Sequence, residues 1–150
     1  MKTDPNLKIS ADEYLFNIMI IDEQHKRFIG IYNSIVRLSE DKENCDCDKI
    51  KSILDDLYDY LRYHFRTEER LMIMAKYQDI EKHIKEHIVY INKVDEFMHA
   101  LRYKNPNLLD NMLAFTKKWF LSHILQTDAK YIDTLKAFLK ENPDIAEILE

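Results

Sequence analysis

The fold is decided by the stretch from Asp79 to Tyr103, which reads DIEKHIKEHIVYINKVDEFMHALRY. Its apolar side chains and two of its histidines recur every three or four residues, which is the spacing of one face of an α-helix. The members of this stripe are Ile80, His83, Ile84, His87, Ile88, Ile91, Val94 and Met98. The stretch therefore predicts a long helix over residues 79–103 that buries one side against other helices.

Three further stretches carry the same spacing of apolar residues. The helices that they predict cover residues 22–40, 49–75 and 108–140. Four long amphipathic helices with short connections bury their apolar stripes best against one another, so the sequence predicts an all-α, up-down-up-down four-helix bundle. We expect a single domain over residues 1–150.

The connections are predicted from turn chemistry. Residues 41–48 are polar, and Asp48 is the expected N-cap of the second helix. The run Asn105-Pro106-Asn107 predicts the break before the fourth helix. Pro143 predicts the end of that helix, with a short tail after it, and residues 1–20, which lack a long helical period, predict an N-terminal arm.

The composition excludes several classes of protein. The chain has one Gly and three Pro in 150 residues, whereas average usage would give roughly ten Gly and seven Pro. Strand-rich folds need turn residues at each hairpin, and a phosphate-binding loop needs several glycines, so both are excluded. The formal net charge of −5 argues against a nucleic-acid partner, which would need a basic excess on one face.

The expected location is the cytoplasm, with no membrane partner. No apolar run approaches the roughly 20 residues that span a bilayer, and no signal peptide is visible behind Met1. The two cysteines, Cys45 and Cys47, flank one residue in a polar stretch. They are interpreted as solvated loop thiols in a reducing compartment, with a redox or soft-metal role as the alternative.

Five of the six histidines fall on the predicted buried stripes. They are His25, His64, His83, His87 and His123. A buried imidazole needs partners for two ring nitrogens, and leaving a buried polar group without one costs about 1–3 kcal/mol. Since a bundle interior of Leu, Ile and Phe offers few partners, we expect metal ions to satisfy these nitrogens.

Two carboxylates join the same stripes. Glu68 follows His64 by four residues, which places both on one helical face. Asp128 follows His123 by five residues, which is about 140° apart around a regular α-helix. We therefore hypothesise a π-bulge between Ser122 and Asp128, because such bulges are frequent at functional sites.

The number and type of these side chains predict the kind of site. Five imidazoles and two carboxylates exceed the four ligands of a structural zinc site, and they suit two adjacent metals bridged by carboxylates. The imidazole-rich, thiolate-free set suits iron, with geometry and supply deciding against copper or zinc.

The same residues carry a family resemblance. They occur in four ordered motifs, which are Asp22-Glu23-Gln24-His25, His64-Phe65-Arg66-Thr67-Glu68-Glu69, His83-Ile84-Lys85-Glu86-His87, and Trp119 with His123-Ile124 and Asp128. With these motifs the chain resembles the hemerythrins over about residues 22–131, and the single-domain bacterial hemerythrins (bacteriohemerythrins) most closely.

The resemblance implies reversible dioxygen binding at two iron ions, Fe2+ or Fe3+, bridged by oxo or hydroxo. The ligands that it implies are His83, His87 and His123 for one iron, His25 and His64 for the other, and Glu68 and Asp128 as bridges. Dioxygen is the implied ligand, at an open position of the two-histidine iron, for storage, delivery or sensing. An oxygen-accepting enzyme or a redox partner is left open.

Large apolar side chains next to these ligands suggest a dry oxygen pocket, although each is equally well interpreted as an ordinary core residue. They are Phe28, Phe65, Phe120, Ile124 and Tyr131. The chain departs from the family at Phe120, where a Leu is common, in the arm at Phe16-Asn17-Ile18, and at Tyr77-Gln78, where Pro is common in the second position.

Other interpretations compete with this one. The motif at His83 and His87 also matches a zinc-peptidase pattern with Glu86, but that interpretation leaves five other candidate ligands unexplained, and Glu86 is expected to face away from the stripe. A ferritin-like site needs two Glu-x-x-His elements, and only the one ending at His99 is present. His99 is expected to be exposed.

The function also has alternatives within the resemblance. A binding protein, and not an enzyme, is the leading hypothesis. A diiron protein that acts on peroxide or nitric oxide, or that handles iron, is the alternative. A purely structural bundle would have to account for five buried histidines without metal.

Overall fold

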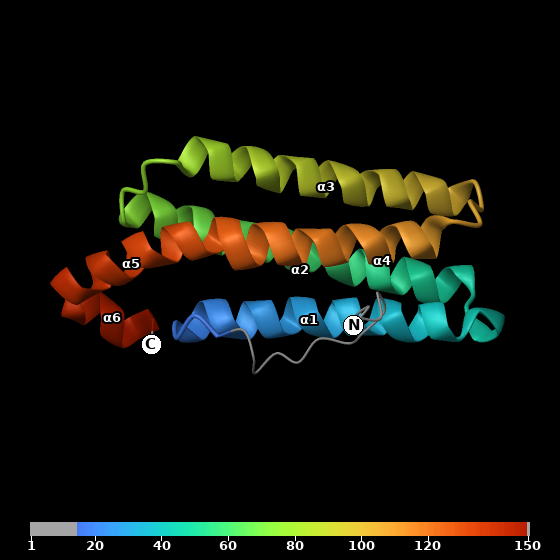
Figure 1. The fold of residues 1–150 in the computed structure, drawn as a ribbon, viewed down its shortest axis with the longest axis horizontal. Helices are drawn as coiled ribbons and strands as arrows, with labels where there is room; N and C mark the ends of the chain where they lie inside the picture. The colour runs from blue at the N-terminus through green and yellow to red at the C-terminus, as the bar shows by residue number, and fades with distance from the viewer. Residues whose placement is uncertain (1–14, 150) are drawn as a thin grey trace, which may run out of the picture.

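The structure, a computed structural model, describes residues 15–149, so most of the predicted N-terminal arm (residues 1–14) lies outside the described residues. The elements are α1 (Met19–Glu40), η2 (Lys42–Asn44), α2 (Cys47–Met74), α3 (Ile80–Arg102), α4 (Leu108–Trp119), η3 (Phe120–Asp128), α5 (Ala129–Glu141) and α6 (Pro143–Leu149). The segments α1, α2, α3 and the continuous α4–η3–α5 rod run antiparallel to their neighbours along the long axis (Figure 1). This arrangement confirms the predicted four-helix bundle.

Two predicted helix starts were too late. The first helix begins at Met19, three residues before the predicted start, because Ile18 already accepts hydrogen bonds from the backbone amides of Ile21 and Asp22. The N-cap of α2 is Asp46, whose carboxylate accepts from the backbone N–H of Lys49 at 2.8 Å, so the prediction of Asp48 was wrong. Both aspartates are suitable N-cap residues. The chain caps with the earlier one, which leaves the other as a favourable negative charge in the first turn.

The predicted tail after Pro143 is helical. Pro143 occupies the first position of α6, where its missing N–H is not needed and its fixed φ suits a helix. Ile145 and Ala146 pack against the apolar cluster formed by the ends of α1, α2 and α5. The tail therefore folds back onto the bundle and closes this end of its core.

The core consists of two apolar clusters with a polar band between them. The larger cluster includes Phe28, Leu61 and Ile124, and the smaller one includes Ile21 and Leu71. Along each bundle helix, the buried histidines and carboxylates lie at or near the boundary between these clusters. The two clusters therefore enclose the polar side chains between two dry layers.

The buried face of α3 differs from the predicted stripe at three positions, because Tyr90 and Phe97 are buried without having been assigned to the stripe and Ile88 is exposed. Its buried residues are His83, His87, Tyr90, Val94 and Phe97. Ile88 was assigned to the stripe but is 53% exposed. Since consecutive residues of a helix lie about 100° apart, a face centred on positions 83, 87, 90 and 94 turns position 88 toward solvent.

The described end of the arm is anchored to α1. The carboxylate of Asp22 accepts from the backbone amides of Phe16 at 2.6 Å and of Asn17 at 2.9 Å. Asn17 has a φ of 63°, a left-handed conformation that Asn adopts more readily than most residues. The turn places the ring of Phe16 edge-on against His25, 5.3 Å between ring centroids.

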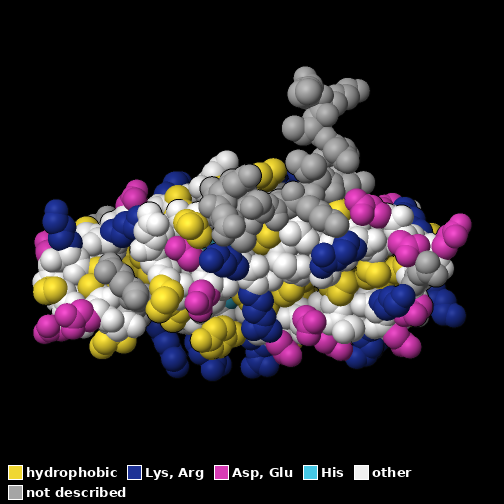
Figure 2. Space-filling model, turned by 90° about the horizontal axis from the view of Figure 1, so that it is seen from below, with side chains coloured by type: hydrophobic (Ala, Val, Ile, Leu, Met, Phe, Trp, Pro, Cys, Tyr) yellow, Lys and Arg dark blue, Asp and Glu magenta, His cyan; other side chains and the backbone are white. Residues whose placement is uncertain are grey.

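The surface has mixed charge. On the face shown in Figure 2, acidic, basic and hydrophobic side chains are interspersed along the length of the bundle, in keeping with a net charge of only −5. None of the described helices is both long enough and apolar enough to cross a membrane.

Candidate metal centre

All seven side chains singled out from the sequence as ligands point into the bundle. Each is at most 2% exposed. They come from all four segments of the bundle: His25 from α1, His64 and Glu68 from α2, His83 and His87 from α3, and His123 and Asp128 from η3. Residues that are up to 103 positions apart in the chain therefore meet in one buried volume.

These side chains form two groups that share one carboxylate. The first group is Glu68, His83, His87, His123 and Asp128, and the second is His25, His64 and Asp128. Within each group, one potential ligand atom from every residue lies within 4.8 Å of the others. Asp128 belongs to both groups because Oδ1 lies 3.0 Å from Nε2 of His83 and of His123, while Oδ2 lies 3.4 Å from Nε2 of His25.

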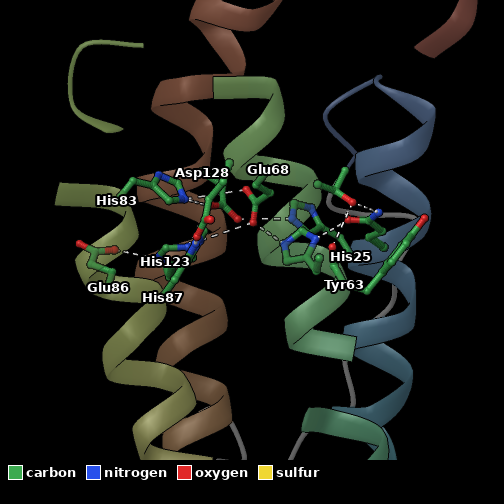
Figure 3. A network of polar contacts seen from close by, with 12 residues as sticks. His25, Tyr63, Glu68, His83, Glu86, His87, His123 and Asp128 are labelled. Carbon is green, nitrogen blue, oxygen red and sulfur yellow. Dashed lines mark hydrogen bonds and ion pairs between the residues drawn. The ribbon is translucent and has the colours of Figure 1, made fainter. Parts of the chain in front are cut away.

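Glu68 also faces histidines from both groups. Its Oε1 lies 2.5 Å from Nε2 of His64 and 3.7 Å from Nε2 of His87, and its Oε2 lies 3.9 Å from Nε2 of His83. Figure 3 shows both carboxylates in the middle of the cluster, with His83 and His123 on one side and His25 on the other. The geometry thus places two anionic groups between two sets of imidazoles.

The hypothesised distortion before Asp128 is present as a full π-helical segment, η3, from Phe120 to Asp128. Because a π-helix bonds residue i to residue i+5, residues five apart come onto one face. The hydroxyl of Thr127 donates to the carbonyl of Ser122, five residues earlier, at 3.3 Å. His123 and Asp128 therefore point into the same site, which a regular α-helix would prevent.

The atoms that point into the cluster have no hydrogen-bond partner among the described residues. These orphaned atoms are Nε2 of all five histidines, both oxygens of Glu68 and both oxygens of Asp128. Several of the nitrogen–oxygen pairs are close, but none is aligned as a hydrogen bond. Lone pairs that converge in a dry interior are costly without a partner. Imidazole nitrogens and carboxylate oxygens are ligand atoms for first-row metals, so the donor set fits two bound cations.

The pKa values of His87 and Asp128 move in the directions that metal ligation requires. Burial, and then the nearby His123 and His83, lower the pKa of His87 to about 2, so its imidazole is neutral. Burial alone would raise the pKa of Asp128, but the neighbouring His123 holds it well below its usual range, so its carboxylate is ionised. Both groups are thus already in their ligating form.

His123 behaves differently without a metal. Burial lowers the pKa of His123, but the charge of Asp128, with contributions from Glu68 and Glu86, outweighs burial and raises it to about 9. A cation at this position must therefore displace a proton from His123 at neutral pH.

Three of the histidines are fixed by residues that were not assigned a role from the sequence. The Nδ1 of His64 lies 2.6 Å from the side-chain oxygen of Gln24, and the Nδ1 of His123 lies 2.6 Å from Oε2 of Glu86. The Nδ1 of His87 lies 3.3 Å from Oε1 of Glu69. When these nitrogens donate, the tautomer leaves Nε2 free to face the cluster.

The position of Glu86 corrects the prediction that it faces away from the site. Glu86 lies on the edge of α3 that faces η3, and its carboxylate reaches across the seam between the two segments to His123 (Figure 3). The positions of these outer residues in the sequence could have indicated their role. Gln24, Glu69 and Glu86 each lie next to a candidate ligand in the motifs, where the side chain of one helix can reach the imidazole of another.

The five residues expected to line an oxygen pocket are all buried, with exposed fractions of 1–3%. Phe28, Phe65, Phe120 and Ile124 belong to the larger apolar cluster, and Tyr131 belongs to the smaller one. Phe65 stacks on His87 at 3.8 Å between ring centroids, and Tyr131 packs edge-on against His83 at 5.3 Å, so both contact the larger group. Phe28 and Phe120 instead stack on each other at 6.4 Å.

Three aromatic contacts were not expected from the sequence. Trp119 stacks on His123 at 3.8 Å between ring centroids, Tyr60 stacks on His64 at 5.3 Å, and Phe16 covers His25. His99, by contrast, is exposed as expected. An aromatic ring therefore covers each of the five buried histidines, which limits the access of water to the cluster.

Comparison with known proteins identifies the family. The model of the Hemerythrin HHE cation binding domain matches residues 17–135. Bacteriohemerythrin of Clostridium acetobutylicum is 32% identical over 124 residues, which are 81% of this chain and 96% of that protein. Bacteriohemerythrin of Pseudomonas aeruginosa is 30% identical over 131 residues, which are 87% of this chain and 82% of that protein.

Solved structures agree with the fold. A crystal structure of a hemerythrin with a leucine-to-tyrosine substitution superposes with a TM-score of 0.73, at 24% identity, and covers 86% of this chain and 96% of that one. The sequence match and the buried cluster of histidines and carboxylates agree with each other. The chain belongs to the hemerythrin family of cation-binding domains.

Proposed function

We propose that this protein binds dioxygen reversibly at two iron ions that Glu68 and Asp128 bridge. The observation that carries the proposal is the convergence of nine orphaned ligand atoms from seven buried side chains, arranged as two groups with a shared carboxylate. Such a set has the size and composition of a two-metal site and exceeds what one structural ion needs. The name bacteriohemerythrin among the relatives supports the same function.

The two ions would have unequal protein ligands. His83, His87 and His123 would hold one ion, while His25 and His64 would hold the other. With fewer protein ligands, the ion held by His25 and His64 would have room for dioxygen, and a pair of ferrous ions would supply the electrons for its reversible binding.

Two features of the chain favour reversible binding of dioxygen over irreversible oxidation of the site. Five of the seven ligands are neutral imidazoles, which stabilise highly oxidised iron less than carboxylates do. The aromatic cover, including Phe16 over His25 and Tyr60 over His64, keeps the two-histidine side dry. Because loss of peroxide from such a site needs a proton, exclusion of water slows irreversible oxidation.

The decisive experiment is the visible absorption spectrum of iron-loaded protein that has been reduced without air. We expect two irons per chain, a charge-transfer band that appears on exposure to air, and loss of the band when oxygen is removed. A variant with His64→Ala keeps the three-histidine group and serves as the control, which should show no reversible band. Irreversible oxidation of the native protein, or rapid turnover of peroxide or nitric oxide, would contradict the proposal.

A further inference from the structure

A cavity of about 410 Å³ lies outside the metal centre, in the seam between α3 and the α4–η3 rod. Its inner wall includes Glu86 and His123, which are joined by the 2.6 Å contact already described. The volume lies in the range of small-molecule sites, roughly 300–1,000 Å³. Neither the metal ligands nor the proposed oxygen chemistry requires a cavity at this place.

Part of the lining of the cavity is apolar and aromatic. It includes Val89 of α3 and the rings of Phe115 and Trp119 of α4. Val89 is 62% exposed, so the apolar surface is open to solvent. Trp119 is stacked between Tyr90, at 4.0 Å between ring centroids, and His123, at 3.8 Å. Both faces of the Trp119 ring are therefore covered, so it offers a ligand its edge, beside the apolar side chains of Val89 and Phe115.

The rim of the cavity is cationic. Lys82, Lys85 and Lys118 all line it, and no contact of their ammonium groups with an acidic side chain occurs in the described part of the chain. The acidic side chain in the wall, Glu86, is already engaged by His123. Three positive charges around one opening favour a negatively charged ligand.

The cavity is better suited to a small molecule than to a protein segment. Along the seam toward the far end of α3, the ammonium group of Lys93 lies over the ring of Phe115, 5.8 Å from its centroid, and it also pairs with Glu96 at 2.9 Å. This side chain covers part of the ring of Phe115 at one end of the cavity. A long helix would have to displace it, whereas a molecule of one or two rings would not.

We propose that this cavity is a binding site for a small aromatic carboxylate. The carboxylate would pair with the ammonium groups of Lys82, Lys85 and Lys118, and the ring would contact Val89 and the edges of Phe115 and Trp119. The binding rests on the cavity alone and does not depend on the proposed oxygen chemistry.

The test is isothermal titration calorimetry of the iron-loaded protein with 2-naphthoate at low ionic strength. For a ligand of this size we expect a Kd of about 1 mM or lower. The neutral analogue 2-naphthamide lacks the negative charge, and the anion acetate lacks the aromatic rings. Each should therefore bind at least about tenfold more weakly than 2-naphthoate. Saturable quenching of Trp119, the only tryptophan, should follow the same Kd.

Two neighbouring positions provide matched variants. Val89→Glu adds a negative charge to the cavity lining and should weaken the binding of 2-naphthoate at least about tenfold. Ile88→Glu makes the same change one residue away, at a position that is also exposed but does not line the cavity, and should leave the Kd within twofold. Replacement of Lys82, Lys85 and Lys118 by Gln should abolish the preference for the anion, whereas Gln at the exposed Lys26, Lys136 and Lys140 should not.

The proposal is overturned by any of three results. One is the absence of 2-naphthoate binding at millimolar concentration, and another is equal weakening by Val89→Glu and Ile88→Glu. The third is tighter binding of a hexaglutamate peptide than of 2-naphthoate, which would make the cavity a docking site for an acidic protein segment. Failure of reversible oxygen binding, by contrast, would leave all these titrations unchanged.

Discussion

The two sides of the metal centre are supported by the chain in different ways. On the α3–η3 side, His123 and His87 contact the carboxylates of Glu86 and Glu69 through Nδ1. On the α1–α2 side, His64 contacts the neutral amide of Gln24. The Nδ1 of His25, like that of His83 on the other side, has no partner among the described residues. On the side with three histidines (His83, His87 and His123), charged carboxylates therefore contact the Nδ1 atoms of the ligands, which we call outer contacts. The side with two histidines (His25 and His64) has no charged outer contact.

This difference indicates how one buried cluster can hold two unequal metal ions. A carboxylate that accepts from an imidazole raises its basicity and fixes its ring, which strengthens its bond to a cation. An amide does so less because it carries no charge. We infer that the α3–η3 side holds its ion firmly, and that the α1–α2 side leaves its ion more exchangeable and more open to a small ligand.

Removal of the shared carboxylate should abolish the distinction and have the largest effect. Asp128→Ala takes away the side chain that belongs to both groups, so we expect iron to fall from two per chain to near zero after loading and desalting. Asp133→Ala, at an exposed position of α5, should keep both irons. Circular dichroism verifies that the helices persist, and two irons bound to Asp128→Ala would refute the shared-ligand assignment.

Removal of metal should occur in two phases. When the reduced, iron-loaded protein is mixed with excess bipyridine without air, we expect one iron to leave at least about tenfold faster than the other. The fast phase corresponds to the side of His25 and His64, which has two histidine ligands and no charged outer contact. Absorbance of the ferrous chelate measures both phases, and a single phase that accounts for two irons would show that the sides are equivalent.

Outer contacts should affect the phases separately. Glu86→Ala should accelerate the slow phase about tenfold and leave the fast phase unchanged, because only His123 loses its partner. Gln24→Ala should accelerate the fast phase by a smaller factor through His64. The exposed neighbours give matched controls, Glu81→Ala on α3 and Glu23→Ala on α1, which should change neither phase. If Glu86→Ala changes both phases equally, the two sides are not independent.

These outer contacts also mark the limit of what the sequence could predict. Periodicity placed the five histidines and Glu68 on inward faces, whereas Asp128 was assigned to the site only with a hypothesised π-bulge, which the structure extends to a π-helix over Phe120–Asp128. The wrong orientation of Glu86 has a physical cause. Its contact with His123 depends on how α3 is rotated against η3, and a pattern within one helix carries no information about that rotation.

The N-cap of α2 illustrates a second limit. Asp46 and Asp48 are equivalent as N-cap residues by type, and the structure distinguishes them only through the hydrogen bond to Lys49. Likewise, Ile88 belongs to an apolar run that is longer than the buried face of α3, so the pattern could not tell which end of the run is exposed.

The smallest expected effect concerns the aromatic wall, which also differs between the sides. Phe65 and Trp119 stack on histidines of the α3–η3 side, whereas Phe120 stacks on Phe28 of α1, one helical turn after His25. Phe120→Leu removes volume without adding a polar atom, so we expect unfolding free energy to fall by about 1 kcal/mol.

The same change should admit water to the two-histidine side. We expect oxidation of the iron-loaded protein in air to accelerate a few-fold in Phe120→Leu, as measured by the decay of the oxygen-dependent band. Phe138→Leu, half-buried in the smaller apolar cluster, makes the same change away from the centre and should leave this rate unaltered. Equal acceleration in both variants would mean that general loosening of the bundle, and not the wall beside His25, controls oxidation, and Phe120 would then be an ordinary core residue.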